Sequence, residues 1–255
     1  MNSQSSVLTE RRDDVLVVTI DRPRARNAVD LSVALGIEAA MEELDADDSL
    51  RVGILTGSEG YFCAGMDLKA FAAGEKPFTD RGFGGLVEKP PRKVLIAAVE
   101  GFALAGGLEL ALACDLIVAA RGVDLAITEV RRGLVAAGGG LLRLPRRLPH
   151  NLAMEMAVTG APIGAERGYE LGFVNRLCEP GEALDQALEL AAMIAPNAPL
   201  AVDLSKAILA DQREWSNAEG WERQTALTDP IFKSADAHEG AVAFAEKRPP
   251  VWRGC

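Results

Sequence analysis

Short apolar runs alternate with amphipathic stretches along the first half of the chain. Apolar runs that end at turn residues predict buried strands at residues 15–20, 51–57 and 93–101. A weaker strand at 6–10 is expected to pair with the first of these runs. Apolar residues at helical spacing over 31–44 predict a helix, with Asp30 as its N-cap. Strands that alternate with helices favour β-α-β units with mostly parallel pairing.

The apolar run at 93–101 leads through a Gly-Gly pair into a predicted helix at 106–114. Further strands are predicted at 115–120 and 124–128. By contrast, the stretch 72–92 mixes glycine, proline and charges of both signs. That mixture predicts a mobile loop or an irregular helix.

From about residue 140 the pattern becomes mainly helical. Two stretches with a period of about 3.6 residues are predicted to end at the stop signals Gly160 and Pro196. A final helix is predicted to be capped by Ser234 or Asp236 and ended by Pro249. We therefore predict an α/β core over residues 1–195 and a helical C-terminal module over residues 196–255. The three tryptophans are interpreted as packing anchors.

Composition and charge narrow the class of protein. With 255 residues and 49% apolar residues, the chain can bury a large core, and its formal net charge of -10 argues against binding nucleic acid or an anionic membrane surface. The N-terminus has no apolar signal segment, and no apolar run reaches about 18 residues. The four cysteines include no CxxC pair, which argues against a zinc site and a disulfide framework. We predict a reduced, cytoplasmic protein.

Common catalytic signatures such as the P-loop, the HExxH helix and the GxSxG turn are absent from the sequence. Three segments remain in which glycine and alanine let a ligand approach the backbone closely, at residues 62–68, 101–111 and 126–140. The first two follow predicted strands, and in an α/β sheet such segments meet at the carboxyl edge, where ligand crevices form.

The second segment combines a helix start with a carboxylate. A helix that starts at Gly106 points free N–H groups outward, where they can polarise a carbonyl and stabilise an enolate. An N–H from the first segment would complete this oxyanion hole. Glu109 in the first turn and Glu129 beyond the next strands then supply an acid and a base. Taken alone, Glu109 could instead satisfy the helix dipole, and Glu129 could pair with a neighbouring arginine.

Taken together, the segments resemble a known family. The sequence "FCAGMDL" at 62–68, "AAVEGFALAGGLELALACDLIVAA" at 97–120 and "TEVRRGL" at 128–134 resembles the crotonase, or enoyl-CoA hydratase/isomerase, superfamily. "RPRARNAV" at 22–29 and the closing "DAHEGAVAFAEKRPP" extend the resemblance over nearly the whole chain. The order and spacing of these motifs are specific for the superfamily and much less specific for the reaction.

The resemblance implies an α/β fold, a spiral of ββα units with a C-terminal helical module, usually assembled as a trimer or a dimer of trimers. It implies a hydratase or dehydratase that acts on the 2,3 bond of an acyl-CoA thioester, without metal or redox cofactor, since coenzyme A is part of the substrate. The implied oxyanion hole is formed by the N–H groups of Met66 and Gly106, and the implied catalytic pair is Glu109 and Glu129. The residues implied to bind the CoA are Ala64, Asp67, Leu68, Lys69 and Lys247, the last of these also able to come from a neighbouring subunit.

Two departures from the family pattern keep other reactions open. Ala136 and Ala137 replace a proline and a glycine that typical hydratases have, and two arginines follow the second glutamate. Arg131 or Arg132 could lower the pKa of Glu129 or recognise a polar acyl group, as in a carnitinyl-CoA dehydratase. An isomerase that uses Glu129, and a non-catalytic acyl-CoA-binding protein on the same fold, are the alternatives.

Overall fold

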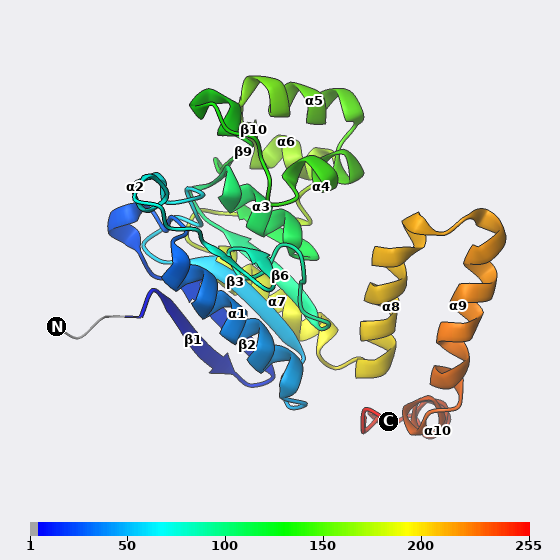
Figure 1. Cartoon of the computed structure of the whole chain (residues 1–255). Coiled ribbons are helices and arrows are strands. Elements are labelled where there is room, and N and C mark those ends of the chain that lie inside the picture. Colours follow the sequence, from blue (N-terminus) through cyan, green and yellow to red (C-terminus); the bar gives the residue numbers. More distant parts are fainter. Residues whose placement is uncertain (1–4) are drawn as a thin grey trace.

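A six-stranded sheet runs through the middle of the molecule in this computed structural model, which describes residues 5–255 (Figure 1). Its order is β1-β2-β3-β6-β8-β11, and only β1 pairs antiparallel, with β2. The predictions of mostly parallel pairing and of a hairpin at the N-terminal end are therefore confirmed. The strands are Val7–Arg12, Val15–Ile20, Val52–Gly57, Val94–Val99, Leu116–Ala120 and Arg176–Cys178, in that spatial order.

Helices cover this sheet where the apolar pattern predicted them. The helix α1 (Leu31–Ala46) begins at Asp30, whose side chain accepts a hydrogen bond from the backbone N–H of Val33 as the predicted N-cap. The helix α7 (Ala183–Ile194) packs against the central strands β3, β6 and β8. Because both faces are covered, the central strands are almost completely buried, which explains their continuous apolar runs.

A second, three-stranded sheet branches from the first. The predicted strand at 93–101 ends at Val99, and the chain turns at Gly101, whose φ is +60°, into β7 (Phe102–Leu104). The strand β7 pairs with β9 (Asp124–Ala126), which pairs with β10 (Ile163–Gly164). The consecutive strands β6 and β7 thus belong to different sheets, as do β8 and β9, and each of these two pairs is followed by a helix.

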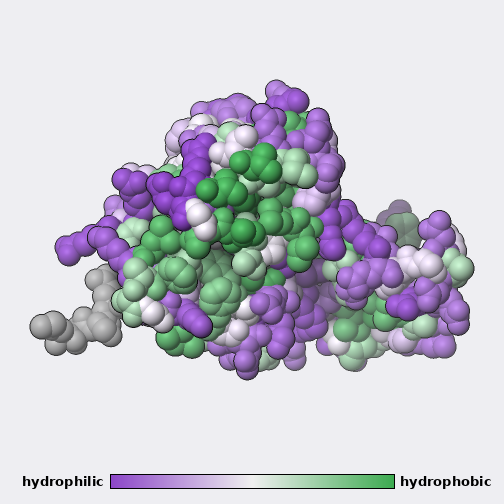
Figure 2. All heavy atoms as spheres, turned by 45° about the horizontal axis from the view of Figure 1, so that its top comes forward, coloured by the Kyte–Doolittle hydropathy of each residue, from purple (hydrophilic) through white to green (hydrophobic). Residues whose placement is uncertain are grey.

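The stretch 72–92 is mostly loop, as its composition predicted, but it also contains two short strands. It follows α2 (Leu68–Ala72) and contains a hairpin of β4 (Phe78–Thr79) and β5 (Gly82–Phe83). Its residues Phe83 and Leu86 are buried in the core. Glycine and proline form tight turns in this loop, between residues that pack inward. Figure 2, which brings the top of Figure 1 forward, shows hydrophobic residues gathered over the middle of this face.

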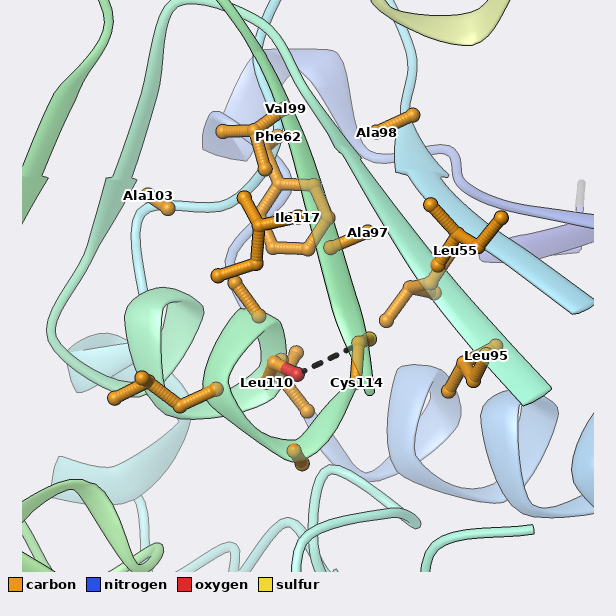
Figure 3. Packing of buried hydrophobic residues seen from close by; sticks show 14 of the residues in the cluster. Leu55, Phe62, Leu95, Ala97, Ala98, Val99, Ala103, Leu110, Cys114 and Ile117 are labelled. Carbon is orange, nitrogen blue, oxygen red and sulfur yellow. Dashed lines mark hydrogen bonds between the residues drawn. The ribbon is translucent and has the colours of Figure 1, made fainter. Parts of the chain in front are cut away.

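The helix α3 (Gly106–Ala113) is buried along its whole length. Figure 3 shows Leu110 of this helix and Cys114 just after it packed against strands that carry Leu55, Leu95 and Ile117. Glu109 is the single charged residue of α3, so its carboxylate lies in an apolar environment unless other elements supply polar contacts.

Shorter elements connect the sheets to the C-terminal helices. These are η1 (Pro23–Ala25), η2 (Glu129–Arg132), α4 (Gly140–Arg147), α5 (His150–Thr159), α6 (Ala165–Glu170) and η3 (Gln212–Glu214). The predicted stop at Gly160 is confirmed, since this residue adopts the left-handed conformation after α5. Three of the four cysteines are buried and all four are free, as expected from their spacing.

The last three helices extend away from the sheets as an arm, visible at the right of Figure 1. They are α8 (Pro199–Asp211), α9 (Asn217–Phe232) and α10 (Ala235–Glu246). Ser234 caps α10, whereas Asp236 accepts hydrogen bonds from the backbone N–H groups of Arg253 and Gly254. Trp252 packs on α10, but Trp221 is 76% exposed and anchors nothing within the chain. The predicted module boundary near residue 195 falls in the link before α8.

In the described part of the chain, no single helix is long and apolar enough to cross a membrane. The bent pair of Ala183–Ile194 and Pro199–Glu214 meets the length and composition criteria only when its two helices are taken together.

Lys206 fastens the arm to the core. Its ammonium group donates to the backbone oxygens of Pro91 and Lys93, at 2.7 and 2.8 Å, and to the carboxylate of Asp115 at 2.7 Å. Since three acceptors match the three donors of the ammonium group, this side chain sets the orientation of α8. Arg92, which pairs with Asp203 of α8, adds a second link.

Replacing Lys206 with methionine should lower the free energy of unfolding by about 2–4 kcal/mol, because three polar groups at the junction lose a charged partner. Chemical denaturation monitored by circular dichroism measures this change. Lys233→Met, at an exposed position after α9, is the matched control and should change stability by less than about 0.5 kcal/mol. Equal stability of the two variants would contradict the assigned role of Lys206.

Candidate active site

The loop after β3 places Met66 with its N–H free. Val29 forms a parallel bridge with Met66, in which the N–H of Val29 donates to the oxygen of Gly65 and the N–H of Asp67 donates to the oxygen of Val29. In such a bridge the N–H and C=O groups of Met66 itself point away from Val29. Within residues 5–255, the N–H of Met66 has no acceptor.

The motif at 22–29 holds this loop in place. Asn27 is completely buried, and its amide donates to the backbone oxygens of Ser58 and Tyr61, at 3.0 and 2.7 Å. Arg22 pairs with Asp67 at 3.1 Å and with Asp30 at 2.9 Å. The polar residues of this motif therefore position the loop, a role that the sequence analysis did not recognise.

Gly106 lies beside Met66 at the start of α3. A Cβ added to Gly65 would lie 3.0 Å from the nitrogen of Gly106, and a Cβ added to Gly106 would lie 3.5 Å from the nitrogen of Met66. The preceding Ala105 has a φ of +50°, an unfavourable conformation for a residue with a side chain. The N–H of Gly106 also lacks an acceptor in the described chain, so two unsatisfied N–H groups lie side by side.

Glu109 is 3% exposed and lies one turn into α3. Its Oε1 accepts a hydrogen bond of 2.9 Å from the N–H of Gly140, the first residue of α4. Burial raises the pKa of this carboxyl, while the N–H groups of Gly140 and Gly138 and the charge of Arg143 act in the opposite direction. A Cβ at Gly138 would lie 2.7 Å from Oε2, so only glycine leaves room for the carboxylate.

Glu129 begins η2 and is 9% exposed. Its Oε2 is buried and has no hydrogen-bond partner among the described residues. Burial and, to a lesser extent, the nearby charge of Glu109 raise the pKa of Glu129 to about 7. The two glutamates are thus close enough to influence each other, and they differ because Glu109 has hydrogen-bond donors.

The arginines after Glu129 do not lower its pKa, which was one of their two expected roles. Arg131 donates to the backbone oxygen of Thr159, and Arg132 donates to the oxygen of Arg131. Neither forms an ion pair with Glu129 in residues 5–255, and the pKa of Glu129 is raised rather than lowered. Two other arginines, Arg143 and Arg147, are partly buried and donate to backbone oxygens.

The predicted CoA-binding residues lie in two separate places. Asp67 caps α2, accepting from the N–H groups of Lys69 and Ala70, so its carboxylate is already occupied by the protein. Leu68 is 43% exposed, Lys69 is exposed, and Ala64 is half-buried in the same loop as Met66. Lys247 follows α10 at the end of the arm, away from α3 in Figure 1. Within one chain the structure does not bring Lys247 to the other four residues.

The two buried carboxyl groups and the two N–H groups without acceptors are the kinds of group that proton transfer next to a polarised oxygen requires. No cluster of three or more histidine, cysteine, aspartate or glutamate residues in the described chain has a geometry that could hold a metal ion. The fold and this site together define an α/β enzyme of the acid–base class.

Comparisons with known proteins agree with that class. A family model described as enoyl-CoA hydratase/isomerase matches residues 10–255. A carnitinyl-CoA dehydratase of Salmonella arizonae is 43% identical over 261 residues, which cover 99% of each chain. The solved enoyl-CoA hydratase from Mycobacterium tuberculosis H37Rv has 56% identity and a TM-score of 0.97, covering 99% of this chain and all of that one. A carnitinyl-CoA hydratase from Mycobacterium avium has 40% identity and a TM-score of 0.80, with coverage of 99% and 100%.

The chain therefore belongs to the enoyl-CoA hydratase/isomerase family, the crotonase superfamily that its motifs resemble. It has the crotonase fold and is an enzyme of the hydratase-like lyase class, which sets aside the non-catalytic alternative.

The raised pKa of Glu129 predicts a pH-dependent effect on stability. Between pH 4.5 and about 7 the unfolded chain loses this proton while the folded chain keeps it, so burying the carboxyl costs more as the pH rises. Glu129→Gln should therefore stabilise the protein by about 1–3 kcal/mol at pH 8 and have little effect at pH 4. Denaturation at both pH values measures this difference, with Glu222→Gln, on the exposed face of α9, as the control for loss of one charge. An equal effect of Glu129→Gln at both pH values would contradict the assigned environment.

Proposed function

We propose that the protein adds water to, or removes water from, the 2,3 position of an acyl-CoA thioester. The single observation that carries the proposal is a pair of buried glutamates that influence each other, one of them in the first turn of the helix that begins at Gly106, whose N–H group and that of Met66 lack acceptors. The relatives named carnitinyl-CoA dehydratase and enoyl-CoA hydratase support the same reaction class.

The two N–H groups would bind the thioester oxygen. The N-terminus of α3 adds partial positive charge at the same point. As the reaction develops negative charge on this oxygen, these donors stabilise the enolate more than the neutral carbonyl, and the β-carbon becomes electrophilic. The ring of Phe83 borders the site with an apolar surface, because two of its carbons lie 2.6 Å from the position of a Cβ on Gly106.

The different surroundings of the glutamates suggest different roles. Glu109, which accepts an N–H bond and lies near Arg143, is better suited to be ionised and to accept a proton from water. Glu129, whose pKa is raised to about 7, is protonated in a substantial fraction of molecules near neutral pH and in that form can deliver a proton to the α-carbon. In hydration Glu109 accepts a proton from water, the resulting hydroxide adds to the β-carbon, and Glu129 delivers a proton to the α-carbon. The two carboxyl groups together then hold as many protons as before. Dehydration follows the same steps in reverse.

Coenzyme A would extend from this site along the loop that contains Ala64, Leu68 and Lys69. Lys69 is exposed and offers a charge to the CoA phosphates, whereas Asp67 supports the loop as a helix cap. The mechanism needs a polarised thioester and two proton carriers, so we propose that it uses no metal or redox cofactor.

Substitution of either glutamate should reduce hydration strongly. With crotonyl-CoA, carnitinyl-CoA and longer acyl-CoAs as substrates, Glu109→Gln and Glu129→Gln should each lower kcat by about 10²–10⁴-fold, because each removes one proton carrier. Loss of the conjugated absorbance on hydration, or its gain on dehydration, measures the rate. Glu222→Gln should retain wild-type rates.

The same measurements distinguish the alternatives. Wild-type protein that turns over none of these thioesters would refute the proposed reaction. Isomerisation that survives Glu109→Ala but not Glu129→Gln would instead assign an enoyl-CoA isomerase that uses Glu129 alone.

We also propose that the arm packs against further copies of this chain in a trimer or a dimer of trimers. Its side chains Trp221, Phe232 and Phe244 are 76%, 79% and 88% exposed, which is unusual for large apolar residues. Association would cover them and could bring Lys247 to the site of a neighbouring subunit.

Phe232→Glu together with Phe244→Glu should convert the oligomer to smaller species in light scattering after gel filtration, because the new charges cannot be buried without partners. The pair Glu222→Gln and Lys233→Met, on the same arm, should leave the mass unchanged. A monomeric wild-type protein would contradict the proposed assembly.

A further inference from the structure

We propose that Arg143 is a positioning residue that holds the turn of residues 138–140 in the orientation that directs its N–H groups at Glu109. This proposal rests on the role proposed above for Glu109, although it concerns how this carboxylate is held rather than what it does.

Arg143 lies on α4, one turn after the glycine turn. Its guanidinium group donates to the backbone oxygen of Val87 on one side and to that of Gly138, at 3.5 Å, on the other. A Cβ on Gly139 would lie only 2.2 Å from Nη1 of Arg143, so the guanidinium group rests directly against the backbone of the turn. One side chain therefore joins the segment after β5 to the turn that faces Glu109.

The other side of the turn faces the carboxylate. The N–H of Gly140 donates to Oε1 of Glu109, and the backbone of Gly138 lies close to Oε2. No side chain caps α4, so the carboxylate of Glu109 takes the place of a cap at this helix start. Since Arg143 binds the carbonyl of Gly138, it favours the peptide orientation in which the N–H groups remain available to Glu109.

Two nearby charges act on the Glu109 carboxylate in opposite directions. Glu129 of η2 repels a negative charge on Glu109, and Arg143 of α4 attracts it. Arg143 itself lies near Arg146 and Cys114, and its partial burial disfavours its own charge. The attraction between Arg143 and Glu109 thus offsets part of the cost of burying both groups.

Arg147 provides a matched comparison on the same helix. It is also partly buried, but it donates to the backbone oxygens of Leu112, at 3.2 Å, and Cys114, at 2.6 Å, at the end of α3. It binds two carbonyls, as Arg143 does, and none of its contacts involves the 138–140 turn. A purely structural role would make substitutions at the two positions equivalent.

The test measures Glu109 directly. In protein labelled with carbon-13 glutamate, the carboxyl signal lost in Glu109→Gln reports the titration of Glu109 without substrate. Arg143→Gln should move the titration of Glu109 to higher pH than in wild type, and Arg143→Lys should move it less, because lysine keeps the charge but cannot bridge both carbonyls. Arg147→Gln should leave this titration unchanged.

Kinetic measurements provide a second readout. In Arg143→Gln the rising limb of the pH profile of kcat should move to higher pH. The value of kcat should fall by about 10-fold or more, with little change in KM. Guanidinium ion added to Arg143→Ala should restore part of the rate, whereas it should not help Arg147→Ala.

The proposal fails if Arg143→Gln leaves the titration of Glu109 at its wild-type position, or if Arg147→Gln shifts it equally. If Arg143→Gln does not fold, Arg143→Lys is decisive, since an unshifted titration in a folded Arg143→Lys variant contradicts the proposal. Absence of hydratase activity in the wild type would refute the proposed function alone, because the titration needs no turnover.

Discussion

The burial of the Glu109 carboxylate in an otherwise apolar helix is the constraint on which the rest of the site depends. A buried carboxylate needs hydrogen-bond donors, and here they come from the backbone of a glycine turn that is distant in sequence. Side chains at Gly138 or Gly140 would occupy the space of the carboxylate itself. Glycines in the turn at 138–140 therefore leave room for the carboxylate of Glu109, and the backbone of this turn supplies the donor that the buried carboxylate needs.

A second constraint acts on the two unsatisfied N–H groups. Met66 and Gly106 come from different strand ends, and they meet because Gly65 lets the loop approach the start of α3 closely. The neighbours of Met66 are bonded to Val29, and Asn27 and Arg22 support the same loop. Rigid support on one side leaves the N–H groups free on the other, and this preorganisation is what stabilisation of a developing oxyanion requires.

Much of this organisation could be predicted from the sequence. The apolar runs and helical periods located β2, β3, β6, α1 and α7 because these elements are buried along a regular pattern. The hairpin within 72–92 could not be predicted in this way, because its strands have two residues each and depend on the burial of Phe83. The contacts of Arg143 and Arg147 could not be predicted either, because the sequence does not show which arginine side chains lie against backbone carbonyls.

The sequence by itself determined the family, the order of the elements and the residue types available for proton transfer, because these follow from local pattern and motif spacing. Only the tertiary structure decided which groups act on each carboxyl. Glu129 has one buried oxygen without a hydrogen-bond partner among the described residues, and its pKa is raised because burial and the charge of Glu109 disfavour its ionised form, although two arginines follow it in sequence. Glu109 has donors because α4 begins against it. Electrostatic environment depends on distances in three dimensions, and neighbours along the chain do not reveal it.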